Sequence, residues 1–218
     1  MQTPPPIAPS AGKVPWSGLL LGIQPRIDLS RSFDQRHHGY LGYLLLVDGE
    51  AGGERKTFSV RIGPAAQAKY GFRAGDRVSG AANAVENAER EVADFYKASE
   101  LRIEERPAPA PPSSPPWVGV PPTLEAYRTR GHRRLDARTY DHACRTCQWG
   151  CRMAVAMIVD QWNPGIVKRR FETFCYGPKS CPFYRPGPTR KVPGRKGMSY
   201  EEEDWVDEEA TSHRGEDD

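Results

Sequence analysis

Hydrophobic and polar residues alternate in short stretches of the first half of the chain, and this alternation predicts β-strands. The clearest case is TFSVRIG, in which Phe58, Val60 and Ile62 face one way while Ser59 and Arg61 face the other. A two-residue period is typical of a strand with one buried face. Turn residues bound four further predicted strands, and a short helix at 64–71 separates the third strand from the fourth. These four strands are 18–29, 40–49, 77–85 and 96–105.

Five strands with a small helix between the third and the fourth follow the order of an OB-fold barrel. The segment FRAGDRVSG resembles that family's entry to its fourth strand, where a Gly-Asp turn (Gly75–Asp76) precedes the returning chain. The resemblance covers residues 16–106 and implies a five-stranded OB-like β-barrel. In that family ligands usually lie across strands 2 and 3, flanked by the loops that join strands 1–2 and 4–5. A small β-barrel of another topology is the alternative.

A proline-rich stretch, PAPAPPSSPPWVGVPPT, divides the chain at residues 107–123. Proline removes backbone donors and holds its neighbours extended, so this stretch is predicted to be a semi-rigid linker. We therefore expect a mainly β protein with a small α+β part and disordered ends. The predicted divisions are a disordered lead (1–15), the OB-like barrel (16–106), the linker (107–123), a basic cysteine-rich module (124–198) and an acidic tail (199–218).

The cysteine-rich module is predicted to contain one apolar helix and one strand. GCRMAVAMIVDQWNPG is densely apolar and ends at Asn163-Pro164-Gly165, which predicts a helix that stops there, and IVKRRFETF predicts the strand that follows. Cysteine pairs flank these elements. The order is loosely similar to zinc-ribbon or treble-clef modules, although it departs from the common zinc ribbon.

All five cysteines lie between residues 144 and 181. The chain begins without the basic and apolar regions of a secretory signal, and no apolar run approaches the length needed to cross a bilayer. We therefore expect a cytoplasmic protein with no membrane partner. Structural disulfides are rare in that compartment, so clustered thiols favour a metal site.

Two spaced pairs, Cys144 with Cys147 and Cys175 with Cys181, have the arrangement of loops that present thiolates to one tetrahedral ion. The sequence therefore predicts a structural Zn²⁺ site made by these four residues. Cys151 is the alternative ligand, because Cys144, Cys147 and Cys151 with one later cysteine would also satisfy a [4Fe-4S] cluster. Absence of any metal is the third possibility.

Charge is segregated along the chain although the net formal charge is only +3. Residues 124–198 carry 16 Lys/Arg and 5 Asp/Glu, whereas residues 199–218 carry 10 Asp/Glu and one Arg. A basic block interspersed with aromatic residues favours a polyanionic partner, because cations neutralise phosphates and rings stack on bases. A merely solvated basic surface is the alternative. The acidic tail is predicted to solubilise the chain, to fold back on the basic module, or to dock a basic protein partner.

The residues predicted to contact nucleic acid fall into two groups, while Trp162 and Phe171 are predicted to lie in the core. Those in the loops of the barrel are Arg31, Phe33, Arg36, His37, His38, Tyr40, Tyr96 and Lys97. Those in the basic module are Lys168, Arg169, Arg170, Arg190, Lys191, Arg195 and Lys196.

Catalytic motifs are not found: no phosphate-binding glycine motif, zinc-protease motif or nucleophile elbow occurs in the sequence, and no small-molecule substrate is indicated. The sequence favours a non-catalytic protein that binds single-stranded or structured RNA or DNA. A protein-protein adaptor with a structural metal, or an Fe-S protein in nucleic-acid processing, are the alternatives. Three segments, PRIDLSRSFDQRHHGYLGYLL, ETFCYGPKSC and VPGRKGMSYEEEDW, are similar to segments of uncharacterised bacterial proteins that join an OB-like barrel to a cysteine cluster, a resemblance that implies no activity.

Overall fold

The computed structural model describes residues 12–32, 34–108, 115–160, 162–163, 165–202 and 205–218, and these residues are mainly β. The strands are β1 (Val14–Arg31), β2 (Arg36–Ala51), β3 (Glu54–Ile62), β4 (Arg77–Ala84), β5 (Phe95–Glu105), β6 (Arg133–Arg134), β7 (Gly150–Ile158), β8 (Val167–Cys175), β9 (Arg190–Pro193) and β10 (Ser199–Glu202). The α-helices are α1 (Pro64–Tyr70), α2 (Leu124–Arg130), α3 (Ala137–Thr139) and α4 (Trp205–Thr211), with a π-helical turn at Tyr140–Cys144 and a 3-10 turn at Arg195–Gly197.

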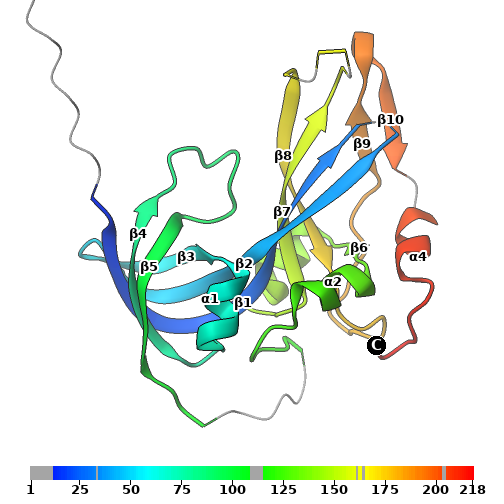
Figure 1. Cartoon of the computed structure of the whole chain (residues 1–218). Coiled ribbons are helices and arrows are strands. Elements are labelled where there is room, and N and C mark those ends of the chain that lie inside the picture. The colour runs from blue at the N-terminus through cyan, green and yellow to red at the C-terminus, as the bar shows by residue number, and fades with distance from the viewer. Residues whose placement is uncertain (1–11, 33, 109–114, 161, 164, 203–204) are drawn as a thin grey trace, which may run out of the picture.

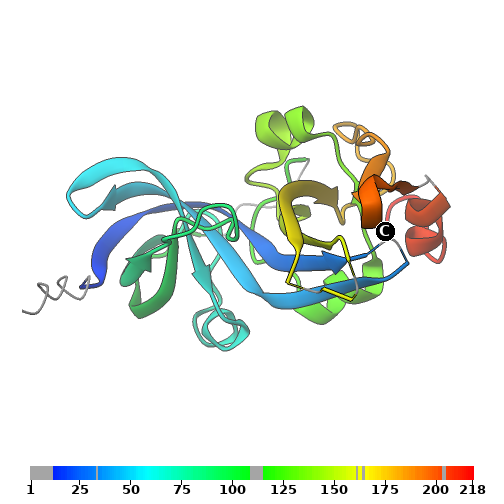
Figure 2. The same cartoon turned by 90° about the horizontal axis from the view of Figure 1, so that it is seen from above.

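Strands β1 to β5 pair in a closed ring, in the order β1-β2-β3-β5-β4 and back to β1 (Figures 1 and 2). The antiparallel register of β2 and β3 is regular from Tyr43 opposite Ile62 to Ala51 opposite Glu54. The alternating pattern that predicted the third strand is confirmed, since Phe58, Val60 and Ile62 are buried. The five strands and the helix before β4 therefore appear in the predicted order.

Strands β1 and β2 are longer than the ring needs, and their extensions join it to the cysteine-rich half. Residues Asp28 to Arg31 of β1 pair in parallel with Ala154 to Met157 of β7. Figure 1 shows the blue β1–β2 pair running from the ring across the molecule to the yellow-green β7 and β8. The predicted loop at 30–40, which carries Arg31 to Tyr40 among the nucleic-acid candidates, therefore belongs in most of its described residues to β1 and β2 of one continuous eight-stranded sheet.

The predicted helix over 150–165 is wrong, because residues 150–158 form the strand β7. Cys151, Met153, Val155 and Met157 are buried, while the residues between them are more exposed, as a strand requires. Ala154 and Ala156 are apolar too, so the two-residue period is hidden in the sequence. Alanine and methionine favour helices, but β7 pairs with β1 on one side and with β8 on the other. This pairing outweighs the helix propensity and makes the segment a strand. The strand predicted after it is confirmed as β8.

A single hydrophobic cluster runs through both halves of the sheet. It includes Leu45 and Val47 inside the ring and continues through Leu29 to Met153 and Val155 of β7. The described part of the linker packs on the same body, since Pro122 accepts a hydrogen bond from the Tyr43 hydroxyl at 2.9 Å. Residues on both sides of the linker thus contribute to one core.

The predicted disordered tail needs correction, since residues 199–202 form β10 beside β9 and residues 205–211 form α4. Val206 and Thr211 are buried against the body of the molecule, and Asp207 accepts hydrogen bonds from the backbone N–H and side chain of Arg134 at 2.9 Å. Charge pairing with the basic half gives this acidic segment a fixed structure that its composition alone does not indicate. None of the helices among the described residues is long and apolar enough to cross a membrane.

Candidate nucleic-acid interface and metal centre

The first cysteine pair lies in a tight turn between the π-helical turn and β7. The N–H of Cys147 donates to the carbonyl of Cys144 at 3.1 Å, and the N–H of Gly150 donates to the carbonyl of Cys147 at 3.0 Å. Gln24 of β1 fixes this turn, because its Nε2 donates to both cysteine carbonyls at 2.7 and 2.9 Å. Tyr140 in turn donates its hydroxyl to Gln24 Oε1 at 2.7 Å. A buried amide thus anchors the turn on the strand that belongs to both halves of the sheet.

The second pair lies where β8 ends. The backbone N–H of Gly177 donates to Cys175 Sγ at 3.3 Å, and the N–H of Cys181 donates to the carbonyl of Pro178 at 3.3 Å. Tight turns whose amides point at sulfur are the geometry that metal-binding cysteine loops use. Both loops of the predicted site therefore have suitable backbone conformations.

The fold brings the two pairs together. Cys144, Cys147 and Cys175 are buried in one small cluster with Leu135 and Tyr140. Burial raises the pKa of Cys144 to about 12, and Cys147, Cys175 and Cys181 contribute to the rise. Burial likewise raises the pKa of Cys147 to about 11, against three backbone N–H groups that lower it. We call Cys144, Cys147, Cys175 and Cys181 the cysteine cluster.

Neighbouring thiols are not yet a closed ligand set. Among the described residues, no group of three or more His, Cys, Asp or Glu side chains is arranged so that it could hold a metal ion as it stands. Binding would therefore require the cysteine side chains to turn toward a common centre, which is usual where metal binding and local folding are coupled.

Cys151 lies apart from the cysteine cluster. It is fully buried in the main core between the strands, and its Sγ is 3.4 Å from the carbonyl of Pro25. Burial raises its pKa far above the ordinary thiol value. This position fits a buried, packed thiol and separates Cys151 from the other four.

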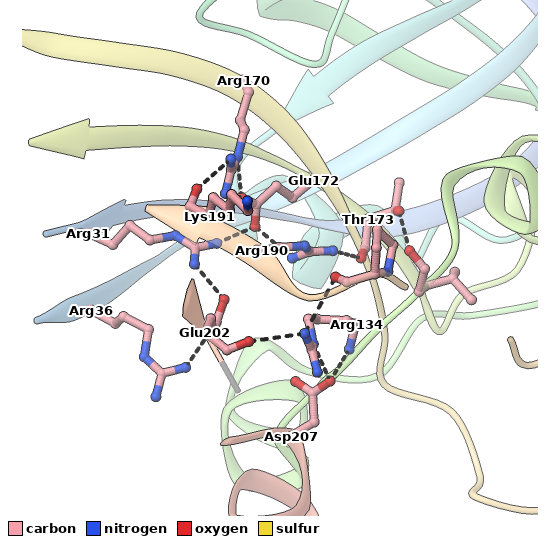
Figure 3. Close-up of polar contacts among 12 residues, drawn as sticks. Arg31, Arg36, Arg134, Arg170, Glu172, Thr173, Arg190, Lys191, Glu202 and Asp207 are labelled. Atoms are coloured by element: carbon pink, nitrogen blue, oxygen red, sulfur yellow. Dashed lines mark hydrogen bonds and ion pairs between the residues drawn. The ribbon is translucent and has the colours of Figure 1, made fainter. Parts of the chain in front are cut away.

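Several of the predicted nucleic-acid contacts are instead used inside the protein (Figure 3). Glu172, itself buried, forms ion pairs with Arg31, Arg170 and Arg190. Arg31 also pairs with Glu202 of β10. Arg31 is 2% exposed and Arg190 is 8% exposed, so neither guanidinium group faces solvent. Their ion pairs instead connect β1, β8, β9 and β10.

The aromatic candidates near the β1–β2 turn are also partly enclosed. His38 packs against His132 with ring centroids 4.8 Å apart and ring planes tilted by 57°. Burial, followed by the charge of Arg36, lowers the pKa of His38 to about 4. Tyr40 lies under the guanidinium of Arg128 at 4.8 Å. Phe33 lies outside the described residues. Tyr96 and Lys97 belong to β5 of the ring. The ammonium of Lys97 lies over the Tyr96 ring, and the guanidinium of Arg61 lies 5.0 Å from the centroid of the same ring.

The remaining candidates gather at one end of the molecule, where the β1–β2 turn, the β7–β8 hairpin and the β9–β10 pair project to the same side (Figure 1). An ion pair of 3.5 Å between Arg195 and Asp160 joins the β9–β10 connection to the end of β7. A second ion pair, of 2.7 Å between Arg36 and Glu202, joins the start of β2 to β10. The exposed basic candidates at this end are Arg36, His37, Lys168, Arg169, Lys191, Arg195 and Lys196.

Trp162 stands out at this end, because it is 80% exposed in the turn between β7 and β8. The prediction that it belongs to the core is wrong. It follows Asp160 by two residues, and Asp160 pairs with Arg195, so an exposed indole lies among the exposed cations. We call Trp162, Lys168, Arg169, Lys191, Arg195 and Lys196 the hairpin-end surface.

One face of the sheet continues from this surface. Ser30, Ala156 and Arg169 are register partners on adjacent strands, and His37 faces Ser30 from β2. In the next row Ala154 faces Phe171, whose ring carries the guanidinium of Arg152 at 4.7 Å. Asp28 pairs with Ala154 from β1, so the small residues of this partly exposed face lie between arginines, a phenylalanine ring and one carboxylate. Sequence reasoning missed Arg152 and this role of Phe171, since only the strand assignment of β7 brings them into register.

Comparisons with protein-family models, with curated proteins and with solved structures find no match for this chain. The similarity of three segments to uncharacterised bacterial proteins stays a prediction. The functional argument therefore depends on the geometry of the residues themselves.

Proposed function

We propose that this protein is a non-catalytic binder of single-stranded nucleic acid that uses the hairpin-end surface. The observation that carries the proposal is the exposed Trp162 among exposed lysines and arginines. An exposed ring stacks on any base, and cations neutralise the phosphates between bases, so together they bind single strands with little sequence preference. The sheet face with Phe171 and Arg152 offers a second stacking position along the same path.

Two finer structural features belong to this proposal. The ring of β1 to β5, with α1 before β4, has the strand order of an OB-like barrel, and its outer face lies beside the basic half. In the second half, the first cysteine turn is followed by the β7–β8 hairpin and then by the second cysteine turn. This order is closer to that of a zinc ribbon than an order with a helix between the turns would be. The barrel then acts as the rigid base from which β1 and β2 extend to the binding surface.

We further propose that the cysteine cluster holds one structural Zn²⁺. The convergence of four cysteines from two turns supports Zn²⁺, and the separate position of Cys151 argues against the [4Fe-4S] alternative. Anaerobic purification followed by metal analysis tests this. We expect a colourless protein with one Zn²⁺ per chain, whereas a brown, iron-containing protein would support the cluster.

Binding is tested by fluorescence anisotropy with labelled single-stranded RNA and DNA and with a duplex, over a range of salt concentrations. Reversing two exposed charges in Lys168→Glu/Arg169→Glu should weaken single-strand binding at least about tenfold at low salt and flatten its salt dependence. Trp162→Ala should weaken binding by about 1–3 kcal/mol with little change in the salt dependence, because stacking is not electrostatic.

A matched control is available at the opposite end of β2. Arg55 and Lys56 are exposed neighbours on β3 that face the far end of that strand, so Arg55→Glu/Lys56→Glu changes the net charge equally. Its affinity should stay close to that of the unmodified protein. Equal losses in both double variants would mean that only overall charge matters, and no binding at low salt would refute the proposal.

An adaptor function is the second candidate, and exposed apolar side chains favour it. Ile166 is 55% exposed in the same turn as Trp162. Exposed aliphatic and aromatic side chains that lie together are also typical of protein-docking sites. Docking of a basic partner on the acidic segment is less favoured, because Glu202 and Asp207 already pair with arginines of this chain. Single-strand binding that is unchanged in Trp162→Ala would shift the assignment of this turn to a protein partner.

A further inference from the structure

Three arginines converge on the loop of the second cysteine pair. Arg130 Nε donates to the carbonyl of Tyr176 at 2.9 Å, and Arg214 Nη2 donates to the carbonyl of Gly177 at 2.5 Å. Arg133 Nη2 donates to the carbonyl of Pro178 at 2.8 Å. Three consecutive carbonyls thus each receive one guanidinium. We call Arg130, Arg133 and Arg214 the guanidinium collar.

The collar has more hydrogen-bond donors than partners. Buried nitrogens without a hydrogen-bond partner are found on all three residues: Arg130 Nη2, Arg133 Nε, and Arg214 Nε and Nη1. Among the described residues, no ion pair joins any of the three to an Asp or Glu side chain, and Arg214 Nη2 also donates to the main-chain oxygen of Asp218 at 2.7 Å. Charged donors buried without acceptors are costly, so the fold indicates a negative group at this place.

Sulfur is the group that the collar surrounds. Arg133 is the register partner of Cys175 where β6 pairs with β8. The three carbonyls that receive the guanidinium groups belong to the residues that follow Cys175 directly. Cys175 Sγ already accepts the N–H of Gly177 at 3.3 Å. Neutral thiols are weak acceptors, whereas metal-bound thiolates are strong ones.

We propose that the guanidinium collar neutralises a thiolate-bound divalent metal ion in the cysteine cluster, and that the C-terminal segment completes the site by supplying Arg214. This inference rests on the proposed metal site. Four thiolates around one divalent ion carry a double negative charge, which the guanidinium groups of the collar offset. Outer partners of this kind orient the ligands and tune the metal.

The C-terminal segment is held at the loop by its own contacts, independently of the metal. Lys179 Nζ donates to the carbonyl of Arg214 at 2.9 Å, and the N–H of Ser180 donates to the carbonyl of Glu216 at 3.0 Å. Ser180 Oγ also donates to Asp217 at 2.6 Å. These bonds place residues 214–217 directly over the turn between Cys175 and Cys181.

The test compares metal binding in the full chain and in three variants. Zn²⁺ affinity is measured by competition with a chelator, and Co²⁺ is used in parallel because its thiolate absorption reports the ligand geometry. Arg214→Gln should bind both ions about 10–100-fold more weakly and shift the Co²⁺–thiolate absorption. Arg214→Lys, which keeps the charge, should recover part of the affinity. Arg128→Gln, on the exposed surface of α2, should bind like the unmodified chain.

The outcomes separate the collar from the metal site itself. If the unmodified chain binds one metal and Arg214→Gln binds it equally well with the same spectrum, the collar is refuted and the site stands. If the unmodified chain binds neither ion after reduction, the metal site is refuted and the collar with it. Should Arg214→Gln fail to fold, Arg133→Gln, which lies in β6, provides the same comparison with the C-terminal segment unchanged.

Discussion

The two halves of this molecule bury different chemistry. In the ring half most fully buried side chains are aliphatic or aromatic, as at Leu45, Val60 and Phe72, and the buried Gln67 and Asp76 are exceptions. The half around β7 and β8 buries thiols and charged groups as well as apolar residues, and its buried charged residues include Glu172, Arg31 and Arg190. Apolar packing tolerates many substitutions, whereas a buried charge depends on one specific partner. The half around β7 and β8 therefore depends on specific pairs between segments that are far apart in the chain, such as Arg31 with Glu172.

The largest effect is expected where one carboxylate serves several arginines. Glu172→Gln removes the charge shared by Arg31, Arg170 and Arg190, and should destabilise the protein by about 3–5 kcal/mol. Urea denaturation followed by tryptophan fluorescence measures the loss. Glu125→Gln, which breaks an exposed pair with Arg128, is the control and should cost less than about 1 kcal/mol. Equal losses would show that the buried network contributes no more than a surface pair.

Acid should weaken the same half before the ring. The pKa of His38 is lowered from 6.5 to about 4 by burial and then by Arg36. The pKa of buried His132 is also lowered well below its usual value, first by burial and then by His38. Each folded pKa lies below the unfolded value, so the unfolded chain takes up protons first. Stability is then complete above about pH 6.5 and falls as the pH drops below it, by about 2 kcal/mol at pH 5 for His38 alone.

The pH dependence of the urea midpoint measures this effect. His38→Asn should flatten the midpoint between pH 6.5 and pH 5, whereas His37→Asn, an exposed neighbour, should leave the curve unchanged. An equally steep curve in His38→Asn would assign the acid sensitivity to other groups.

How far the sequence predicts this structure follows from the same contrast. The ring was predictable because its strands alternate locally and pair with near neighbours, as Phe58 to Ile62 of β3 do with β2. The strand β7 was not, because its partner on one side, Asp28 to Arg31, lies more than 120 residues earlier in the chain. The cysteine spacing predicted that Cys144, Cys147 and Cys175 lie near one another, as they do in one small buried cluster, while the four-cysteine metal site stays a prediction. It did not predict the guanidinium collar, whose members come from α2, β6 and the C-terminal segment.

A smaller loss is expected at the residue that ties the first cysteine turn to β1. Gln24→Ala leaves the carbonyls of Cys144 and Cys147 without their side-chain donor and should cost about 1–2 kcal/mol. It should also weaken Zn²⁺ retention, because the turn then loses its fixed position. Gln67→Ala is matched, since Gln67 is a buried glutamine that caps the carbonyl of Phe72 in the ring half. It should lower stability without changing Zn²⁺ affinity; a similar loss of Zn²⁺ in both would show that the two halves are not independent.

The smallest effect is expected at an exposed arginine of the cysteine-rich half, and it separates burial from residue type. Arg128 pairs with Glu125 at 2.8 Å, and both side chains are more than half exposed. It also lies over the Tyr40 ring at 4.8 Å. Arg128→Ala should therefore cost about 0.5–1 kcal/mol, the usual sum of a surface pair and an exposed cation–π contact.

Arg134→Ala is the matched comparison, because Arg134 is 3% exposed and binds Asp207 of α4. It should cost several times more than Arg128→Ala, since Asp207 and the C-terminal segment lose their anchor. The rate of limited proteolysis near the C-terminal end measures how firmly that segment is held. We expect faster cleavage in Arg134→Ala and no change in Arg128→Ala. Equal stability and equal cleavage in the two variants would mean that the basic residues of this half act only as solvated charge, and the contrast between its buried and exposed arginines would fail.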